Sequence, residues 1–370
     1  MNRWGIAATA LGVALVMAAG PAGAEQLGKL GGALKRVQQF KDVEMTDAEE
    51  ALLGAEVSQR IRTRYGVVQS QPVHTYVALV GTALAQASTK PELAWTFVVL
   101  DTDAVNAFAA PGGFIHITKG ALAHLKSESE LAGVLGHEII HVTEKHTIRA
   151  IQKGKLVQMG ADESLAGNSA LMNKLADKAY EVVEGGFGRA EELESDEQGI
   201  VLANAVGYAP QGMNGFLNML MERNKDAAPV RNGLFASHPE TKERVDRMTK
   251  QIASARLAST ATADARYTTT ITFTPVAATE IATIEAGSAG AAGATAKPAE
   301  EPKKKGLGGL AGRLRPSGGE RKSAQVTGSG AARGAGGEDR LGKGGANPAL
   351  VAVTLSAADV AAFKKAGGLK

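Results

Sequence analysis

Cysteine is absent from all 370 residues of the chain. This absence excludes a disulfide framework and a lipobox cysteine for lipid attachment. Aromatic residues are also scarce, at 4%, whereas glycine reaches 45 residues, and this combination indicates that part of the chain does not pack into a core. The net charge is only +3, so we expect no nucleic-acid partner. The 44% of hydrophobic residues still allows a substantial core, in one large domain or two.

Long apolar runs are missing as well, except at the start of the chain. A short positive stretch, Met1–Arg3, precedes an apolar run over Trp4–Ala19, and Ala22–Ala24 matches an A-x-A cleavage site. This pattern is typical of a cleavable secretory signal peptide, here residues 1–24. A membrane anchor is the alternative, which the shortness of the run disfavours. We therefore expect a periplasmic or otherwise exported protein.

One stretch carries candidate metal chemistry. Residues 137–141 read H-E-x-x-H, and Ser127 with Glu130 forms a capping pattern that predicts a helix around them. His137 and His141 then lie on one helical face, where two neutral imidazoles can share one Zn²⁺ ion per chain. Glu138 can reach a water on that ion as general base. The alternative is a pair of surface histidines.

A second acidic motif lies far downstream, in residues 189–199. A two-histidine zinc site needs a third protein ligand, and Glu192 is the candidate. Asp196 is four residues further on the same helical face, where it can hold a ligand histidine by its second nitrogen. The alternative is a solvated acidic face, to which we assign Glu191, Glu194 and Glu197.

The two motifs together resemble a known family. G-H-E-x-x-H-V at residues 136–142, followed by E-x-x-x-D with a trailing glycine, is similar to metallopeptidase family forty-eight, which includes the HtpX, BepA-like and CAAX prenyl proteases. Further matches are Asn106–Gly113, His146, and Ser237–Pro239 with Arg244 beyond it. The resemblance covers about residues 45–250. Gly188 and Ser195 depart from the family pattern, and neither is an expected ligand.

The resemblance implies roles for individual residues. The first Glu of E-x-x-x-D is the third zinc ligand in the family, which matches Glu192. His146 is expected in the shell around the ligands. The loop with His238 approaches the metal in the family, so His238 would stabilise the oxyanion or occupy the open metal position in a latent state. A packing histidine ahead of a helix over residues 240–253 is the alternative.

The surrounding pattern predicts helices over Asp47–Tyr65 and Val73–Gln86, and strands over Trp95–Leu100 and Phe114–Thr118 with a turn-rich link between them. The predicted inward stripe of the first helix is Leu52, Leu53, Val57 and Ile61. We expect the second strand to offer an edge beside the metal that aligns the substrate backbone. Its candidate residues are Phe114, Ile115, His116 and Ile117. We predict that His116 is a structural or surface histidine and not a ligand, that His74 and His124 lie on the surface, and that Gly185–Gly188 is a hinge.

The character of the chain changes after residue 257. We expect residues 258–284 to add a strand after the main domain, because threonine alternates with apolar residues over Arg266–Thr274. Residues 285–349 are rich in Gly, Ala, Lys and Arg and predict a disordered linker. Weak contact of this basic tail with a membrane or cell wall is the alternative to a plain linker. Residues 350–370 predict a short strand and a helix capped by Ser356.

The sequence thus predicts an α+β protein: a mainly helical, zincin-like metalloprotease domain with a small β-sheet over residues 25–257, plus a low-complexity C-terminal tail. The expected function is zinc-dependent endopeptidase activity in envelope protein quality control. The expected partners are polypeptide substrates, namely misfolded or unassembled envelope proteins. The alternative is a chaperone-like assembly factor with a largely latent protease site.

Overall fold

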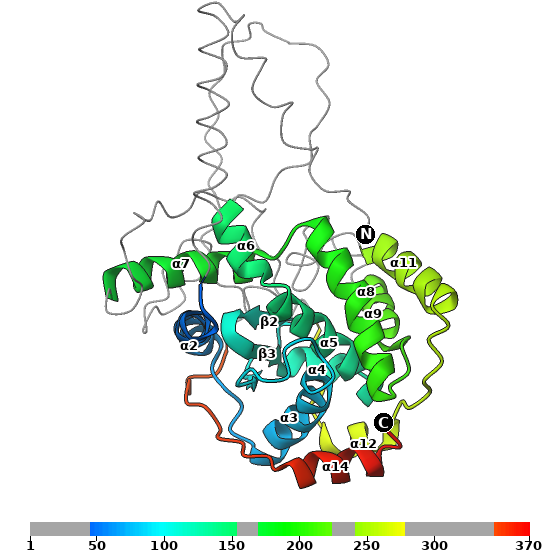
Figure 1. Ribbon diagram of the computed structural model, residues 1–370. Coiled ribbons are helices and arrows are strands. Elements are labelled where there is room, and N and C mark those ends of the chain that lie inside the picture. The colour runs from blue at the N-terminus through cyan, green and yellow to red at the C-terminus, as the bar shows by residue number, and fades with distance from the viewer. Residues whose placement is uncertain (1–44, 154–168, 224–240, 278–343) are drawn as a thin grey trace, which may run out of the picture. The chain divides into compact units, whose positions relative to one another are not determined.

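The computed structural model describes residues 45–153, 169–223, 241–277 and 344–370 (Figure 1). From Asp47 onward these residues belong to one compact unit. The predicted signal peptide, most of the predicted linker and His238 lie outside the described residues. Within the described ranges, no helix combines the length and apolarity that a bilayer crossing requires.

The chain folds into helices around one small sheet, as the sequence predicts. The strands are β1 (Thr96–Leu100), β2 (Ala107–Ala110) and β3 (Phe114–Thr118), with a 3₁₀ turn, η1 (Pro111–Gly113), between the last two. The helices are α2 (Asp47–Tyr65), α3 (Gln71–Ala85), α4 (Lys119–His124), α5 (Glu128–Thr143), α6 (His146–Lys153), α7 (Ser169–Gly185), α8 (Arg189–Val206), α9 (Gly212–Arg223), α11 (Thr241–Ser254), α12 (Asp264–Thr270) and α14 (Ala357–Ala366).

The sheet has the order β1-β3-β2, with β3 parallel to β1 and antiparallel to β2. Every residue of Phe114–Thr118 pairs with β1, and Phe114–Ile117 also pair with β2. The expectation that this strand offers a free edge to substrate is therefore wrong, because β3 is the central strand. The predicted turn-rich link is confirmed over Pro111–Gly113, but its first half is wrong, because Ala107–Ala110 form β2. Its alanines carry no strong strand propensity, so only the pairing with β3 reveals it.

Helix α5 lies at the centre of the fold and packs against α3, α8 and α9 (Figure 1). Two glycines allow α5 and α8 to approach closely. A Cβ atom at Gly136 would lie 3.1 Å from the carbonyl oxygen of Gly199, and one at Gly199 would lie 3.0 Å from the backbone nitrogen of His137. The absence of side chains here brings the downstream acidic motif against the H-E-x-x-H helix.

The N-terminal helices form where the sequence predicts them. In α2, Leu53, Val57 and Ile61 are fully buried. Leu52, which we placed in the same stripe, is 56% exposed. The helical period explains this error, because residues 53, 57 and 61 are spaced by four and share one face, whereas residue 52 is rotated away from it.

The predicted strand after residue 257 is a helix, α12. Its threonine hydroxyls bond to carbonyls one turn back, at 3.0 Å from Thr268 to Asp264 and 2.7 Å from Thr269 to Ala265. Tyr267 is buried and donates to the carbonyl of Leu122 at 2.6 Å. Tertiary contacts therefore override the β propensity of the threonines.

The tail also differs from expectation. Residues 350–355 are extended but form no strand, whereas α14 begins as predicted with a capping box between Ser356 and Asp359. Residues 344–349, which fall in the predicted linker, contact the folded unit. The amide of Gly345 donates to Asp101 O at 2.6 Å, and the amide of Val67 donates to Asn347 O at 2.7 Å.

Candidate metal centre

Helix α5 presents the H-E-x-x-H residues from a well-defined start. Ser127 is the N-cap, and its hydroxyl accepts from the amide of Glu130 at 3.1 Å. A capping box has a second hydrogen bond, from the amide of the N-cap residue to the carboxylate three residues on. Here the carboxylate of Glu130 accepts from the amide of Lys126 at 2.7 Å instead of from the amide of Ser127, so only the first of the two predicted bonds forms. The helix then runs without a break to Thr143, which places residues 137 and 141 one turn apart.

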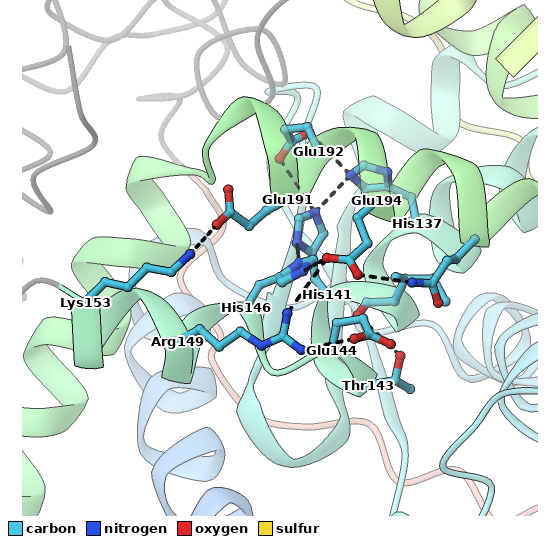
Figure 2. Close-up of polar contacts among 12 residues, drawn as sticks. His137, His141, Thr143, Glu144, His146, Arg149, Lys153, Glu191, Glu192 and Glu194 are labelled. Atoms are coloured by element: carbon cyan, nitrogen blue, oxygen red, sulfur yellow. Dashed lines mark hydrogen bonds and ion pairs between the residues drawn. The ribbon is translucent and has the colours of Figure 1, made fainter. Parts of the chain in front are cut away.

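Three predicted ligands converge on one point. His137, His141 and Glu192 each offer a ligand atom, all of these atoms lie within 4.8 Å of one another, and all three residues are buried. The Nε2 atoms of the histidines are 3.0 Å apart, and the Glu192 oxygens lie 3.5 Å from His137 and 3.6 Å from His141 (Figure 2). Donor atoms bound tetrahedrally to zinc are separated by roughly 3.3–3.5 Å, so this geometry fits a zinc ion.

Asp196 holds the first ligand histidine, as predicted. Its Oδ1 lies 3.0 Å from His137 Nδ1, so Nδ1 carries the proton and Nε2 points its lone pair at the ligand cluster. Burial lowers the pKa of His137, but the carboxylates of Asp196 and Glu192 outweigh burial and raise it to about 9. A cation, either a proton or a metal ion, is therefore strongly favoured between these donors.

Arg244, on α11, contacts both Asp196 and Glu192. It donates to both oxygens of Asp196 at 2.7 Å, and its third nitrogen lies 3.2 Å from Glu192. Burial raises the pKa of Asp196, but Arg244 outweighs burial and lowers it, so the carboxylate stays ionised. The arginine thus compensates two buried carboxylates at once, a role that the sequence motif did not reveal.

His146 supports the second ligand histidine. Its Nδ1 lies 2.8 Å from His141 Nδ1, and its Nε2 lies 3.1 Å from Glu194 (Figure 2). If His141 donates from Nδ1, His146 accepts there and donates from Nε2 to Glu194, and the lone pair of His141 Nε2 then points toward the ligand cluster. Glu194 has a side chain that is 38% exposed, which agrees with its predicted place on a solvated face, and it also accepts from His146 at the end of this series of hydrogen bonds. Glu191 pairs with Lys153 at 2.9 Å, as a surface residue would.

Phe187 is a site residue that the sequence analysis missed. Its ring stacks on His141 with centroids 4.1 Å apart and an angle of 20°, and it is 4% exposed. The predicted hinge over Gly185–Gly188 is therefore a packed segment, although Gly186 has a positive φ of 76°. A single aromatic residue within a glycine run was the signal that could have identified it.

Glu138 lies on α5 beside the first ligand and is 1% exposed. Burial lowers the pKa of Arg244, but the carboxylates of Asp196 and Glu192 and, to a smaller extent, that of Glu138 raise it. The candidate general base is thus close enough to the ligand cluster to act electrostatically on its surroundings.

The other described histidines do not belong to the metal centre. His116 is fully buried on β3, where Nε2 lies 2.9 Å from the hydroxyl of Ser58, and burial lowers its pKa to about 3. It is structural, as predicted. His74 is also buried, with Nε2 2.9 Å from the Val68 carbonyl, so its prediction as a surface residue is wrong. His124 is part-buried and bonds the Gly120 carbonyl.

The edge of the sheet reaches the metal centre through β2 instead of β3. Ala109 and Ala110 line one small cavity together with His141. An ion pair between Glu50 and Lys145 lies on the wall of the same cavity. Among the described strands, β2 pairs with β3 alone. The sheet edge beside the metal is therefore β2.

The chain is similar in sequence to known proteins. Residues 73–252 match peptidase family M48. The chain is 25% identical over 211 residues to a putative beta-barrel assembly-enhancing protease of Vibrio cholerae, covering 54% of this chain and 43% of that protein. It is 27% identical over 187 residues to the beta-barrel assembly-enhancing protease of Escherichia coli K12, covering 47% and 38%. Metalloprotease YcaL of the same bacterium is 27% identical over 165 residues, covering 43% of this chain and 63% of YcaL.

The chain spans only about two fifths of the length of the two assembly-enhancing proteases. The matched region nevertheless contains His137, His141, Glu192 and Arg244, which form the centre described above. The agreement between a family match and a converged ligand set leads to one assignment: this chain carries a metallopeptidase domain that belongs to peptidase family M48.

Proposed function

We propose that this chain is a zinc-dependent endopeptidase that hydrolyses peptide bonds in exported polypeptides. The observation that carries the proposal is the convergence of His137, His141 and Glu192, which come from two distant parts of the sequence. Two histidines and one carboxylate are the ligand set of catalytic zinc sites that keep one position open. Soft ions such as Cu⁺ prefer thiolate ligands and hard ions such as Mg²⁺ prefer oxygen ligands, so both suit this ligand set less well than zinc.

The residues around the ligands divide the chemistry among them. Zinc, when bound, supplies a Lewis acid and lowers the pKa of a water to about 7. Glu138 accepts the proton of the attacking water and afterwards donates it to the leaving amine. Asp196 and His146 hold the two ligand imidazoles in the tautomer that directs Nε2 inward. Arg244 keeps the carboxylate of Asp196 ionised.

Strand β2 supplies the proposed alignment of the substrate. An extended peptide can add to a sheet edge through main-chain hydrogen bonds. Ala109 and Ala110 lie at the edge nearest His141, so a segment placed along them would pass the ligand cluster.

The proposed substrates are misfolded or unassembled envelope proteins. Two supports favour this class. The N-terminal residues 1–24 have the pattern of a secretory signal peptide, which supports the proposal that the mature chain is exported. The relatives that share residues of this domain are named beta-barrel assembly-enhancing proteases, so envelope proteins are the natural substrate class to test.

The test compares wild-type protein with the Glu138→Gln variant on unfolded casein, with metal content measured in parallel. We expect both proteins to hold zinc and only the wild type to cleave, because glutamine cannot accept the proton of the water. Loss of the general base should lower the rate by about 10²–10⁴-fold. Equal cleavage by both proteins would remove Glu138 from this role. Glu144→Gln, at the C-cap of the same helix, is the control and should leave cleavage unchanged.

A second candidate function is a chaperone-like assembly factor whose protease site is usually latent. The burial of the site favours it, because His137, Glu138 and His141 are only 1–2% exposed. His238, outside the described residues, remains the candidate that occupies the open metal position. The His238→Ala variant should then cleave casein faster than the wild type. If neither protein cleaves, yet both suppress aggregation of an unfolded outer-membrane protein, the chaperone function is favoured.

A further inference from the structure

The last part of the chain, residues 344–370, lies against the folded unit although residues 278–343 separate it in sequence from the rest. We call residues 344–370 the C-terminal segment. It lies outside the matched family region, which ends at residue 252. Figure 1 shows its helix, α14, alongside α3 and α12. Nothing in the family assignment accounts for this contact.

The first half of the C-terminal segment is held mainly by its main chain. Side chains of the folded unit donate to its carbonyls: Arg62 to Pro348 at 2.6 Å, Gln69 to Ala349 at 3.1 Å, and Gln71 to Ala352 at 2.9 Å. The amide of Val67 donates to a fourth carbonyl, that of Asn347. Main-chain recognition of this kind is how proteins bind extended peptides.

The side chains of residues 350–355 alternate between two environments. Leu350, Ala352 and Thr354 are exposed, whereas Val351, Val353 and Leu355 are half-buried. Val353 and Leu355 pack against the hydrophobic core. This period of two is that of an extended peptide lying on an apolar surface. The surface therefore fits peptides whose apolar residues alternate.

The second half is anchored by two side chains of α14, Val360 and Phe363, which are the buried residues of that helix. The guanidinium of Arg266 lies 4.0 Å from the centroid of the Phe363 ring and donates to the Phe363 carbonyl at 2.9 Å. The ring of Tyr76 meets Phe363 edge-on at 6.2 Å. An aromatic anchor in a cationic, aromatic-lined recess is a strong point of peptide recognition.

The anchor connects to the start of the active-site helix. Glu128, the first residue of α5, is fully buried and accepts from Tyr76 at 2.6 Å, from Tyr208 at 2.6 Å and from Arg266 at 2.6 Å. Arg266 thus contacts both the C-terminal segment and the helix that carries the zinc ligands. Occupation of the surface by a peptide is physically linked to the position of Arg266.

We propose that this surface is a peptide-binding site and that the C-terminal segment is its resident ligand, bound in cis and able to detach. The site takes an extended peptide with alternating apolar residues, followed by a short helix that carries an aromatic residue. Its recognition elements are Arg62, Gln69, Gln71, Tyr76 and Arg266. Only Val360 and Phe363 of α14 are buried, whereas the central helix α5 is buried along nearly its whole length.

The test uses the full chain with a recognition sequence for a site-specific protease inserted between residues 300 and 330. After folding and cutting, gel filtration shows whether the C-terminal fragment still elutes with the rest. A synthetic peptide of residues 344–370 is then added in excess. We expect the fragment to stay bound after cutting and to be displaced by the peptide within hours. These readouts measure binding alone, so a failure of the proposed peptidase activity would not affect them.

Matched peptides sharpen the test. Phe363→Ala removes the buried anchor, whereas Leu350→Ala removes an apolar side chain that is 46% exposed. We expect the first change to weaken displacement at least about tenfold and the second to leave it within about twofold. A fragment that a 100-fold excess of wild-type peptide cannot displace in one day would show an integral part of the fold and overturn the proposal. A fragment that leaves on cutting and does not rebind as peptide would overturn it as well.

Discussion

Arg244 donates two hydrogen bonds of 2.7 Å to Asp196, and both side chains are 1% exposed. Asp196 in turn contacts His137, and Arg244 also lies 3.2 Å from Glu192. One arginine from α11 therefore supports one proposed metal ligand, Glu192, directly and a second, His137, through Asp196. The metal centre depends on α11 as well as on the two helices that carry its ligands.

Removal of this arginine should destabilise the fold. The Arg244→Met change leaves two buried carboxylates without their cation, which costs about 3–5 kcal/mol for a buried ion pair. Urea unfolding of the metal-free protein measures the loss. Arg247→Met is the matched control on the same helix, because Arg247 is 44% exposed and its nearest carboxylate oxygen, on Glu197, is 3.7 Å away. The control should change stability by less than about 1 kcal/mol. Equal losses in both variants would contradict the role of Arg244.

The ring of Phe187 should contribute both packing and order at the site. Phe187→Ala removes a buried aromatic side chain that stacks on His141, and such changes cost about 3–5 kcal/mol. Phe187→Leu keeps most of the apolar volume and should cost clearly less. Chemical unfolding of both metal-free variants gives the comparison. A similar, small effect of the two changes would show that the stacking contact contributes little.

The support of His141 by His146 predicts an effect on metal affinity. His146→Ala removes the partner 2.8 Å from His141 Nδ1, so the ligand ring loses its fixed orientation. Loss of such a partner typically weakens metal binding about 10–100-fold. Competition with a zinc chelator measures the affinity. His124→Ala, which removes a histidine outside the centre, should bind zinc like the wild type. Unchanged affinity in His146→Ala would refute this role.

Zinc binding should depend on pH in a defined direction. The pKa of His137 in the metal-free site is raised to about 9, so this imidazole is protonated at neutral pH. A metal ion must displace that proton, because only the neutral ring can be a ligand. Apparent zinc affinity should therefore rise with pH by up to about tenfold per unit between pH 6 and pH 8. Isothermal titration calorimetry at several pH values measures this affinity, and an affinity that does not change with pH would contradict the prediction.

The sequence was most informative where local spacing and chemistry coincide. His137 and His141 are separated by one helical turn, so a helix alone brings them together. Glu192 and Asp196 have the same spacing, and the structure confirms that their helix meets the first one. Sequence spacing cannot show how two helices pack, and here the facing glycines, Gly136 and Gly199, determine it.

The sequence failed where a tertiary contact decides the outcome. Residues 107–110 form a strand only because β3 pairs with them. Residues 264–270 form a helix because Arg266 and Tyr267 are held by Glu128 and the Leu122 carbonyl. Glu194 and Phe187 belong to the site because they contact His146 and His141, which lie on other helices. None of these partners is near in sequence, so no local pattern could identify them.

The metal content of the purified protein tests the central claim most directly. Native mass spectrometry should find one zinc ion per wild-type chain and none on the Glu192→Ala variant after dialysis. Glu197→Ala is the matched control, because Glu197 lies on the same helix with its side chain 43% exposed, and it should retain one zinc ion. A wild-type chain that binds no divalent metal, or a Glu192→Ala chain that holds zinc as tightly as the wild type, would contradict the assignment of this metal centre.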